Sequence, residues 1–154
     1  MFLRDADGEP QIIDRLTGAV ISHKTKNASA AMHGEVPLDS GGVATPVFML
    51  MTETYMVDAY SPDTVASTVG ISATRIRQFA ADLADAAFAK EVVINQPWTD
   101  WKGEKHDTMV GRPVSMHSMR GISAHSNGFQ TCRALHVLQL MLGSIEVPGG
   151  WRFK

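Results

Sequence analysis

The residues best suited to chemistry stand in one short polar segment, MRGISAHSNG, at positions 119–128. An apolar stretch precedes this segment and a long apolar run follows it, so we expect a strand to end here and a helix to begin. In open α/β sheets, ligands bind at the carboxyl ends of strands. The N–H groups at the start of a helix lack intrahelical partners and suit phosphate or another anion. The segment is therefore a candidate binding loop.

The polar side chains of this loop fit such a site. Arg120 adds a fixed positive charge, and the flanking glycines allow close approach of the backbone. Ser126 or Asn127 can cap the helix, and His125 can gain or lose a proton near neutral pH. A capped helix with a turn before it would need the same residues, and the loop matches neither a dinucleotide fingerprint nor a phosphate-binding P-loop. The residue types alone leave both interpretations open.

No residue of the chain is predicted to be catalytic or to bind a metal. The remaining histidines are expected on a strand, on an apolar helix or in loops, without ligand spacing: His117, His136, His23, His33 and His106. The single cysteine, Cys132, excludes an internal disulfide and a cysteine-only cluster, and its helical apolar context predicts burial. No Gly-x-Ser-x-Gly nucleophile elbow occurs.

The elements that position the loop follow from hydrophobic spacing and from capping residues. Short strands with turn residues between them predict a hairpin over residues 11–21, and another strand is expected near Val36. Three helices follow, opened by Pro46, Ser61-Pro62 and Ser72. The last third of the chain predicts a buried strand, a polar and aromatic excursion, a second strand and a final helix, at 92–94, 97–107, 113–119 and 128–142.

This order predicts an α/β fold, a partial Rossmann-like layer of parallel strands covered by helices, with an N-terminal hairpin and long loops. Two parts are expected: residues 1–45 as hairpin and loop excursion, and residues 46–154 as the α/β segment. The final helix is apolar nearly all round, so it needs cover on several sides.

Composition limits the class of protein. The 154 residues are 44% hydrophobic and 19% charged, an ordinary globular balance, and the net charge of −2 provides no basic field for nucleic acid. No apolar run reaches the roughly 20 residues that span a bilayer. A soluble chain that binds no nucleic acid is expected.

Two blocks of the sequence carry a family resemblance. The first holds Arg133-Ala134, Leu138 and Leu142-Gly143, followed by the turn Val147-Pro148-Gly149-Gly150. The second is YSPDTVA at residues 60–66 with GISATRIR at residues 70–77. Together, over residues 47–151, they resemble the molybdopterin oxidoreductases of the dimethyl sulfoxide reductase superfamily. The pattern leans toward the sulfur-compound branch, the polysulfide, thiosulfate, tetrathionate and sulfite-oxidising catalytic subunits.

The resemblance implies a molybdenum-dependent enzyme that moves electron pairs between a small, sulfur-containing substrate and an iron–sulfur partner. The complete enzyme would hold a bis(molybdopterin guanine dinucleotide) cofactor and a [4Fe–4S] cluster. In that family the strand-to-helix loop lines the pterin, which implies cofactor-binding roles for Arg120, Gly121, Ser123, Ala124, His125, Ser126 and Asn127. The cluster motif, the molybdenum ligand and the C-terminal dinucleotide domain have no counterpart here. We therefore expect a central segment of a catalytic subunit, inactive alone and unable to bind the cluster.

The implied partners are the remainder of the catalytic subunit and an iron–sulfur electron-transfer subunit, with a membrane-anchor subunit left open. The expected compartment is the bacterial cytoplasm or periplasm. The alternative is a stand-alone small α/β binding or oligomerisation module without catalytic activity. Such a module would self-associate through its uncovered apolar helix and through Trp98 and Trp101.

Overall fold

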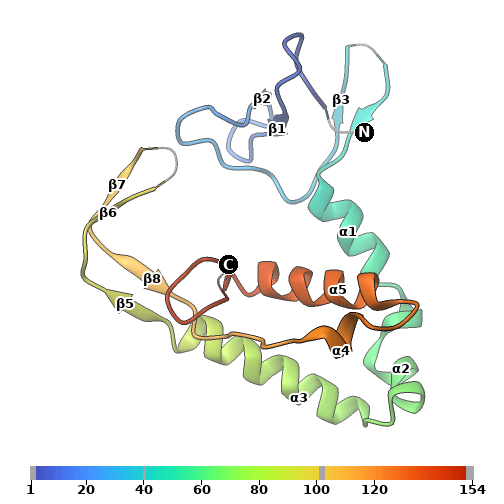
Figure 1. Ribbon diagram of the computed structural model, residues 1–154. Helices are drawn as coiled ribbons and strands as arrows, with labels where there is room; N and C mark the ends of the chain where they lie inside the picture. Colours follow the sequence, from blue (N-terminus) through green and yellow to red (C-terminus); the bar gives the residue numbers. More distant parts are fainter. Residues whose placement is uncertain (1–2, 40, 101–102, 152–154) are drawn as a thin grey trace. The chain divides into compact units, whose positions relative to one another are not determined.

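The computed structural model of the protein describes residues 3–39, 41–100 and 103–151. The chain divides into two compact units, Met1–Val69 and Gly70–Lys154. Figure 1 shows their elements coloured along the sequence. The domain boundary expected after residue 45 stays a prediction.

The first unit holds two small hairpins and two helices. The predicted N-terminal hairpin is confirmed: β1 (Gln11–Ile13) pairs antiparallel with β2 (Val20–Ser22). The strand expected near Val36 is β3 (Val36–Pro37), which pairs with β4 (Val43–Ala44). The helices follow as α1 (Val47–Tyr55), the short 3₁₀ turn η1 (Asp58–Tyr60) and α2 (Pro62–Val69). Pro46 and Pro62 start α1 and α2 as predicted, because a proline at the first turn forfeits no helical hydrogen bond.

Asp14 closes the turn between β1 and β2. Its side chain is buried, and it accepts hydrogen bonds from the Thr17 hydroxyl at 2.8 Å and from the Ser29 N–H at 3.1 Å. The bond from Thr17, reinforced by the Ser29 N–H, lowers the pKa of this carboxyl below its usual range because both donors favour the charged form. The turn is therefore fixed by an ionised aspartate.

The second unit is built around two helices. Helix α3 (Ala73–Ala84) begins at Ser72, whose hydroxyl oxygen accepts from the Arg75 N–H at 3.3 Å, and it widens into the π-helical turn η2 (Asp85–Ala89). Helix α4 (Arg120–Ser123) precedes α5 (Gly128–Met141), close to the predicted bounds of the final helix. Between η2 and α4 lie the strands β5 (Val92–Ile94), β6 (Trp98–Thr99), β7 (Lys105–His106) and β8 (Met109–Gly111).

The predicted parallel layer is wrong. The protein mixes helices and strands, but every sheet of the described residues is a two-stranded antiparallel pair. β5 pairs with β8, and β6, which lies between them in the sequence, pairs with β7, so residues 92–100 and 103–111 form two nested antiparallel pairs. A parallel pair needs a crossover of a dozen or more residues, whereas the polar excursion folds back on itself and returns the chain antiparallel.

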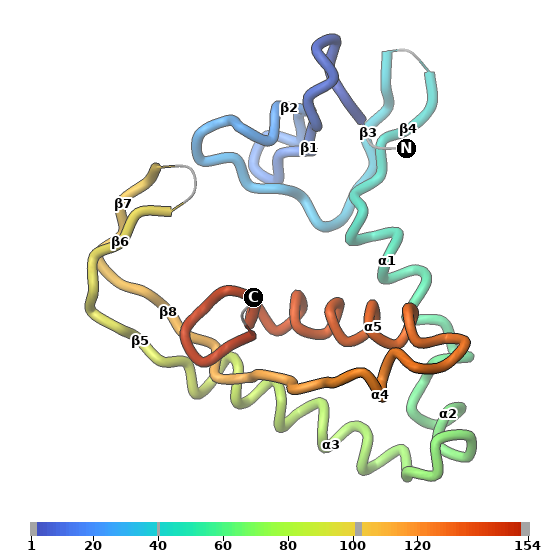
Figure 2. Tube along the Cα trace, in the orientation of Figure 1, coloured from blue at the N-terminus to red at the C-terminus, as the bar shows by residue number. Residues whose placement is uncertain are grey.

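The second strand predicted at 113–119 is also wrong. Residues 112–119 run in extended form without a strand partner, and Pro113 has no N–H to donate to a ladder. In Figures 1 and 2 this stretch passes between α3 and α5. This stretch does not join a sheet, and it supplies Val114 and Met116 to the core.

The core of the second unit is small. Only Ala87, Val114 and Leu142 are buried apolar residues in the described chain, and four others pack partly against them: Leu83, Ala86, Met116 and Leu138. The burial predicted for strand 92–94 is wrong, since Val92 and Val93 are exposed. Cys132, also predicted to be buried, is half-buried.

Apolar surface is left uncovered on both helices. Phe79 on α3 is 59% exposed, and on α5 Phe129 is 77% and Leu140 is 64% exposed. The accessible surface of the chain is 11462 Å², whereas two compact globules of half this mass would expose about 9,200 Å² together. The apolar faces predicted from the sequence exist, but this chain does not cover them. Among the described residues, no helix combines the length and hydrophobicity needed to cross a membrane.

Candidate functional site

The predicted loop forms a short turn of helix between the extended stretch and α5. The Ile122 N–H bonds the Met119 carbonyl at 3.1 Å, which starts α4, and the Gly128 N–H bonds the His125 carbonyl at 2.9 Å, which leads into α5. A ring nitrogen of His125 lies 3.1 Å from the Gly121 carbonyl, where its N–H donates to that oxygen. The loop is thus shaped by its own backbone bonds.

All seven residues predicted to bind a cofactor are exposed: Arg120, Gly121, Ser123, Ala124, His125, Ser126 and Asn127. Ile122, which the sequence did not single out, is half-buried. The structure therefore brings the predicted residues together on one exposed turn. Their binding role is a proposal, which is argued below from their chemistry.

The predicted side-chain cap of α5 is not formed. Asn127 stands at the N-cap position, but it makes no capping hydrogen bond through its side chain. Its backbone has φ −103° and ψ 13°, whereas a capping residue is normally extended. The positive end of a 14-residue helix dipole is thus left without a capping side chain.

Two glycines of the loop have different constraints. A Cβ built on Gly128 would lie 2.1 Å from the Ser123 carbonyl oxygen, so the packing of α4 against α5 requires a glycine there. A Cβ on Gly121 would meet nothing within 4 Å. Gly121 is therefore free of packing demands and leaves open space above its backbone.

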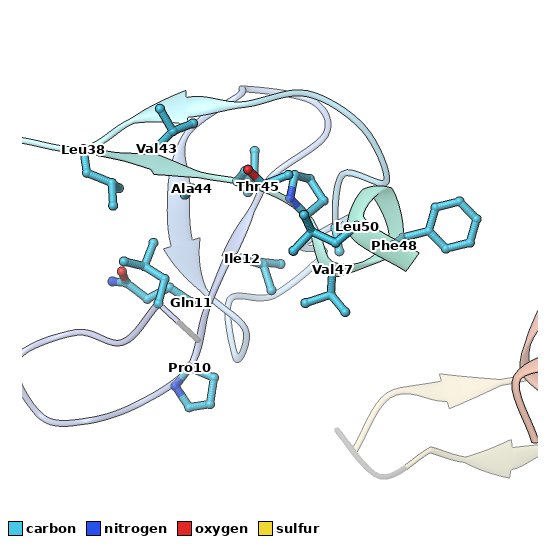
Figure 3. A pocket seen from close by; sticks show the side chains of 14 residues that line it. Pro10, Gln11, Ile12, Leu38, Val43, Ala44, Thr45, Val47, Phe48 and Leu50 are labelled. Carbon is cyan, nitrogen blue, oxygen red and sulfur yellow. The ribbon is translucent and has the colours of Figure 1, made fainter. Parts of the chain in front are cut away.

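The first unit contains an apolar cavity that the sequence did not predict. It has a volume of about 830 Å³ and is formed by β1, the β3–β4 hairpin and the start of α1 (Figure 3). Its described lining includes Ile12, Leu38, Val43 and Val47, and no titratable side chain. This cavity can bury apolar groups but supplies no acid, base or metal ligand.

A further cluster lies in the predicted excursion at residues 97–107, where the sequence did not predict a site. Asp100, Glu104 and His106 each offer a ligand atom, and these atoms lie within 4.8 Å of one another. The sequence did contain a signal for this cluster: side chains alternate along two paired strands, so every second residue lies on the same face. That signal was missed because residues 97–107 were treated as an irregular excursion. Trp101, named above with Trp98 as a surface for self-association, lies outside the described residues.

The chain is similar in sequence to part of a much longer protein. It is 39% identical over 141 residues to a protein of Allochromatium vinosum that is named as a sulfite dehydrogenase subunit. The match takes in 92% of this chain and 14% of that protein, so the chain spans about one-seventh of the length of this relative. No protein-family model matches the chain, and no solved structure matches it.

These findings correct the family expected from the sequence motifs. The match covers too little of the relative, and no family model supports it, so membership of the molybdopterin oxidoreductases is not shown for this small chain. What stands is the coarser relation to one subunit of a sulfite dehydrogenase. The relative's name describes one subunit, which points to partner subunits for that protein.

Proposed function

We propose that this chain forms part of an oxidoreductase that acts on sulfite or a closely related sulfur oxyanion, and that its loop at 120–127 binds the anionic edge of a cofactor. The observation that carries this proposal is the 39% identity to a sulfite dehydrogenase subunit across 92% of the chain. A match of that extent spans both units and both ends of α5. Related sequence over this length favours the same fold and the same surroundings in the larger protein.

The chemistry of the loop supports an anionic ligand. Arg120 supplies a guanidinium that can form paired hydrogen bonds to phosphate oxygens. The uncapped start of α5 supplies N–H groups without intrahelical partners. Ser126 adds an exposed residue with a hydroxyl group, the Ser123 hydroxyl donates to the Arg120 carbonyl and keeps its oxygen as an acceptor, and the open space above Gly121 admits a ligand close to the backbone.

The cofactor we propose is a bis(molybdopterin guanine dinucleotide) group of molybdenum in the complete enzyme. The donors of the loop fit its diphosphate groups, because those groups carry negative charge and accept hydrogen bonds. When bound, such a cofactor supplies two-electron redox chemistry to the substrate. The residues of this chain would hold and orient it, with Arg120 and the first turn of α5 as the anion-binding groups. A [4Fe–4S] cluster and an iron–sulfur partner subunit belong to the same proposal, outside this chain.

The uncovered apolar side chains support a place inside a larger protein. Burying a side chain such as Phe129 or Leu140 contributes roughly 1.5–3 kcal/mol, and both are mostly exposed here. We propose that other parts of the subunit cover them. A second copy of this chain could cover the same face, which is the observation that favours the stand-alone oligomerisation module.

A chimaera tests the proposed function directly. The 141 matched residues would replace their counterpart in the sulfite dehydrogenase subunit of Allochromatium vinosum. We expect the purified chimaera to retain sulfite oxidation and to contain molybdenum and pterin. Arg120→Ala in the chimaera should weaken cofactor retention about 10- to 100-fold, the loss expected for one charge-assisted interaction. Arg75→Ala, which removes an exposed arginine of α3, is the matched control and should leave the cofactor content unchanged.

Normal cofactor content in the Arg120→Ala chimaera would show that the loop is only a turn. A folded, soluble chimaera that oxidises no sulfite would contradict the relation to sulfite chemistry. For the alternative function, light scattering on the 154-residue chain should show a defined dimer that Phe129→Ser dissociates. A defined oligomer insensitive to Phe129→Ser and Leu140→Ser would exclude this face as the contact.

A further inference from the structure

The β6–β7 hairpin carries side chains with metal-ligand chemistry on one face. Trp98 pairs with His106, and Thr99 pairs with Lys105. The next pair is closed by the Asp100 N–H, which bonds the Glu104 carbonyl at 2.9 Å. Because side chains alternate along a strand and paired residues share a face, Trp98, Asp100, Glu104 and His106 point to one side. Thr99 and Lys105 point to the other.

The three ligand-type groups on this face converge on one point. A ring nitrogen of His106, Nε2, lies 3.1 Å from Oδ2 of Asp100. Glu104 completes the set, and the three ligand atoms lie within 4.8 Å of one another. All three residues are half-buried, and the Asp100 side chain is only 17% exposed. This cluster thus combines an imidazole with two carboxylates in a partly desolvated place.

Neighbouring groups hold the cluster in position. The indole ring of Trp98 stacks on His106 with 4.7 Å between ring centres, and its N–H donates to the Thr108 carbonyl at 2.8 Å. Oδ1 of Asp100 accepts the Glu104 N–H at 2.9 Å, which leaves Oδ2 turned toward His106. Such outer contacts orient metal ligands in proteins.

An ion pair between Asp100 and His106 accounts for the positions of these two side chains, but not for the position of Glu104. Among the described residues, the Glu104 carboxylate has no hydrogen-bond or ion-pair partner. It nevertheless lies within reach of the other two ligand atoms. A second carboxylate beside Asp100 is repelled by it unless a cation is shared, and Lys105 is on the opposite face.

We propose that Asp100, Glu104 and His106 bind a divalent transition-metal ion, with Zn²⁺ the best match. Imidazole and carboxylate ligands together suit Zn²⁺, whereas Mg²⁺ and Ca²⁺ prefer oxygen ligands alone. Tetrahedral Zn²⁺ with bonds of about 2.0–2.1 Å places its ligand atoms roughly 3.3 Å apart, a spacing that side-chain rotation reaches from the present one. Nε2 of His106 would exchange its contact with Asp100 for the metal, and a fourth position would stay open to water.

Calorimetric titration of the 154-residue chain with ZnCl₂ tests this site. We expect one ion per chain in this site. Outer-contact losses weaken metal binding about 10- to 100-fold, so removal of a ligand in His106→Asn or Glu104→Gln should weaken it at least about 100-fold. Thr99→Ala and Lys105→Ala change the other face of the same hairpin and should leave the affinity unchanged. The ¹⁵N chemical shift of the His106 ring should move on addition of Zn²⁺, which separates this site from the other histidines.

Two results would overturn the proposal. One is that the original chain and Glu104→Gln bind Zn²⁺ with the same affinity, or that neither binds it. The other is Ca²⁺ binding as tight as Zn²⁺ binding and insensitive to His106→Asn, which would indicate a carboxylate site without the imidazole. Far-UV circular dichroism checks folding. If His106→Asn unfolds the chain, Glu104→Gln decides, because its side chain makes no described bond that folding would lose.

Discussion

Both ends of α5 lie next to turns that contain glycine and serine, but the serine is buried at the C-terminal end and the serines are exposed at the N-terminal end. At the C-terminal end, the turn from Ser144 to Trp151 is closed by its own backbone: the Trp151 N–H bonds the Ser144 carbonyl at 2.7 Å, and the Glu146 N–H bonds the Trp151 carbonyl at 2.9 Å. Gln139 and Ser144 are fully buried, and the Ser144 hydroxyl donates to the Gln139 side chain. The polar groups at this end of α5 therefore form hydrogen bonds with one another and stabilise the turn.

At the N-terminal end, the loop from Arg120 to Asn127 is exposed except for Ile122, and Asn127 leaves the helix without a side-chain cap. Gly150 and Gly121 show the same contrast, whereas Gly128, at the first residue of α5, is enclosed like Gly150. A Cβ on Gly150 would lie 2.0 Å from the Ser144 carbonyl oxygen, whereas a Cβ on Gly121 would meet nothing within 4 Å. Glycine and serine in a turn therefore do not by themselves indicate a binding site. What distinguishes the loop is that its polar side chains stay exposed, although the Ser123 hydroxyl and the His125 ring donate to the Arg120 and Gly121 carbonyls.

The largest expected effect is on the closed turn. Gly150→Ala would force the Ser144 backbone to move, because the clash is with a carbonyl oxygen and not with a flexible side chain. We expect a loss of about 3 kcal/mol or more in the free energy of unfolding, at the upper end for overpacking. Urea denaturation measures it. A loss below about 0.5 kcal/mol would show that the turn is not closed as described.

Ser144→Ala should have the next largest effect. It removes the hydroxyl that donates to Gln139, whose side-chain nitrogen already lacks a partner, so a buried amide is left unsatisfied. We expect a loss of about 1–3 kcal/mol in the same denaturation experiment. Ser123→Ala is the matched control in the open loop and should stay within about 0.5 kcal/mol of the original chain. Equal losses for the two variants would contradict the contrast between the ends of α5.

Gly121→Ala should separate binding from stability. Its Cβ enters open space, and the residue lies in a helical turn, so the free energy of unfolding should change by less than about 1 kcal/mol, with alanine favoured. In the chimaera with the sulfite dehydrogenase subunit, the added methyl group should reduce cofactor content. Unchanged cofactor content would indicate that no ligand approaches this backbone.

The smallest effect concerns the Asp14 turn of the first unit, another turn closed by its own polar groups. Because the Thr17 hydroxyl and the Ser29 N–H lower the pKa of Asp14 in the folded state, the stability they contribute is present above the unfolded pKa of about 3.9. It is lost as the pH falls through the lower folded pKa. The stability difference between the original chain and Thr17→Val should therefore shrink from about pH 5 downward, as followed by urea denaturation. Thr25→Val, outside this turn, should show no such pH dependence.

Local features of the structure were largely predictable from the sequence. The β1–β2 hairpin, the Ser72 cap of α3 and the extent of α5 follow from turn residues, capping residues and apolar spacing. The position of the candidate loop, at the start of the last helix, follows from the same signals. These features depend on residues a few positions apart, so the sequence contains the physical cause of each.

Pairing and burial could not be predicted in the same way. β5 joins β8 across 14 intervening residues, Ile94 to Met109, and only the folded chain shows that the excursion between them turns back. The meeting of Asp100, Glu104 and His106 depends on that hairpin register. Apolar spacing identified the faces of α3 and α5 that need cover, but spacing does not reveal whether the same chain provides it.

The sequence by itself determined where helices and turns begin, because capping and periodicity act between near neighbours. The tertiary structure alone decided that the strands pair antiparallel, that Gly150 is enclosed while Gly121 is open, and that three ligand side chains share one face. These outcomes depend on contacts between residues distant in the chain, whose energies are fixed only when the backbone brings them together.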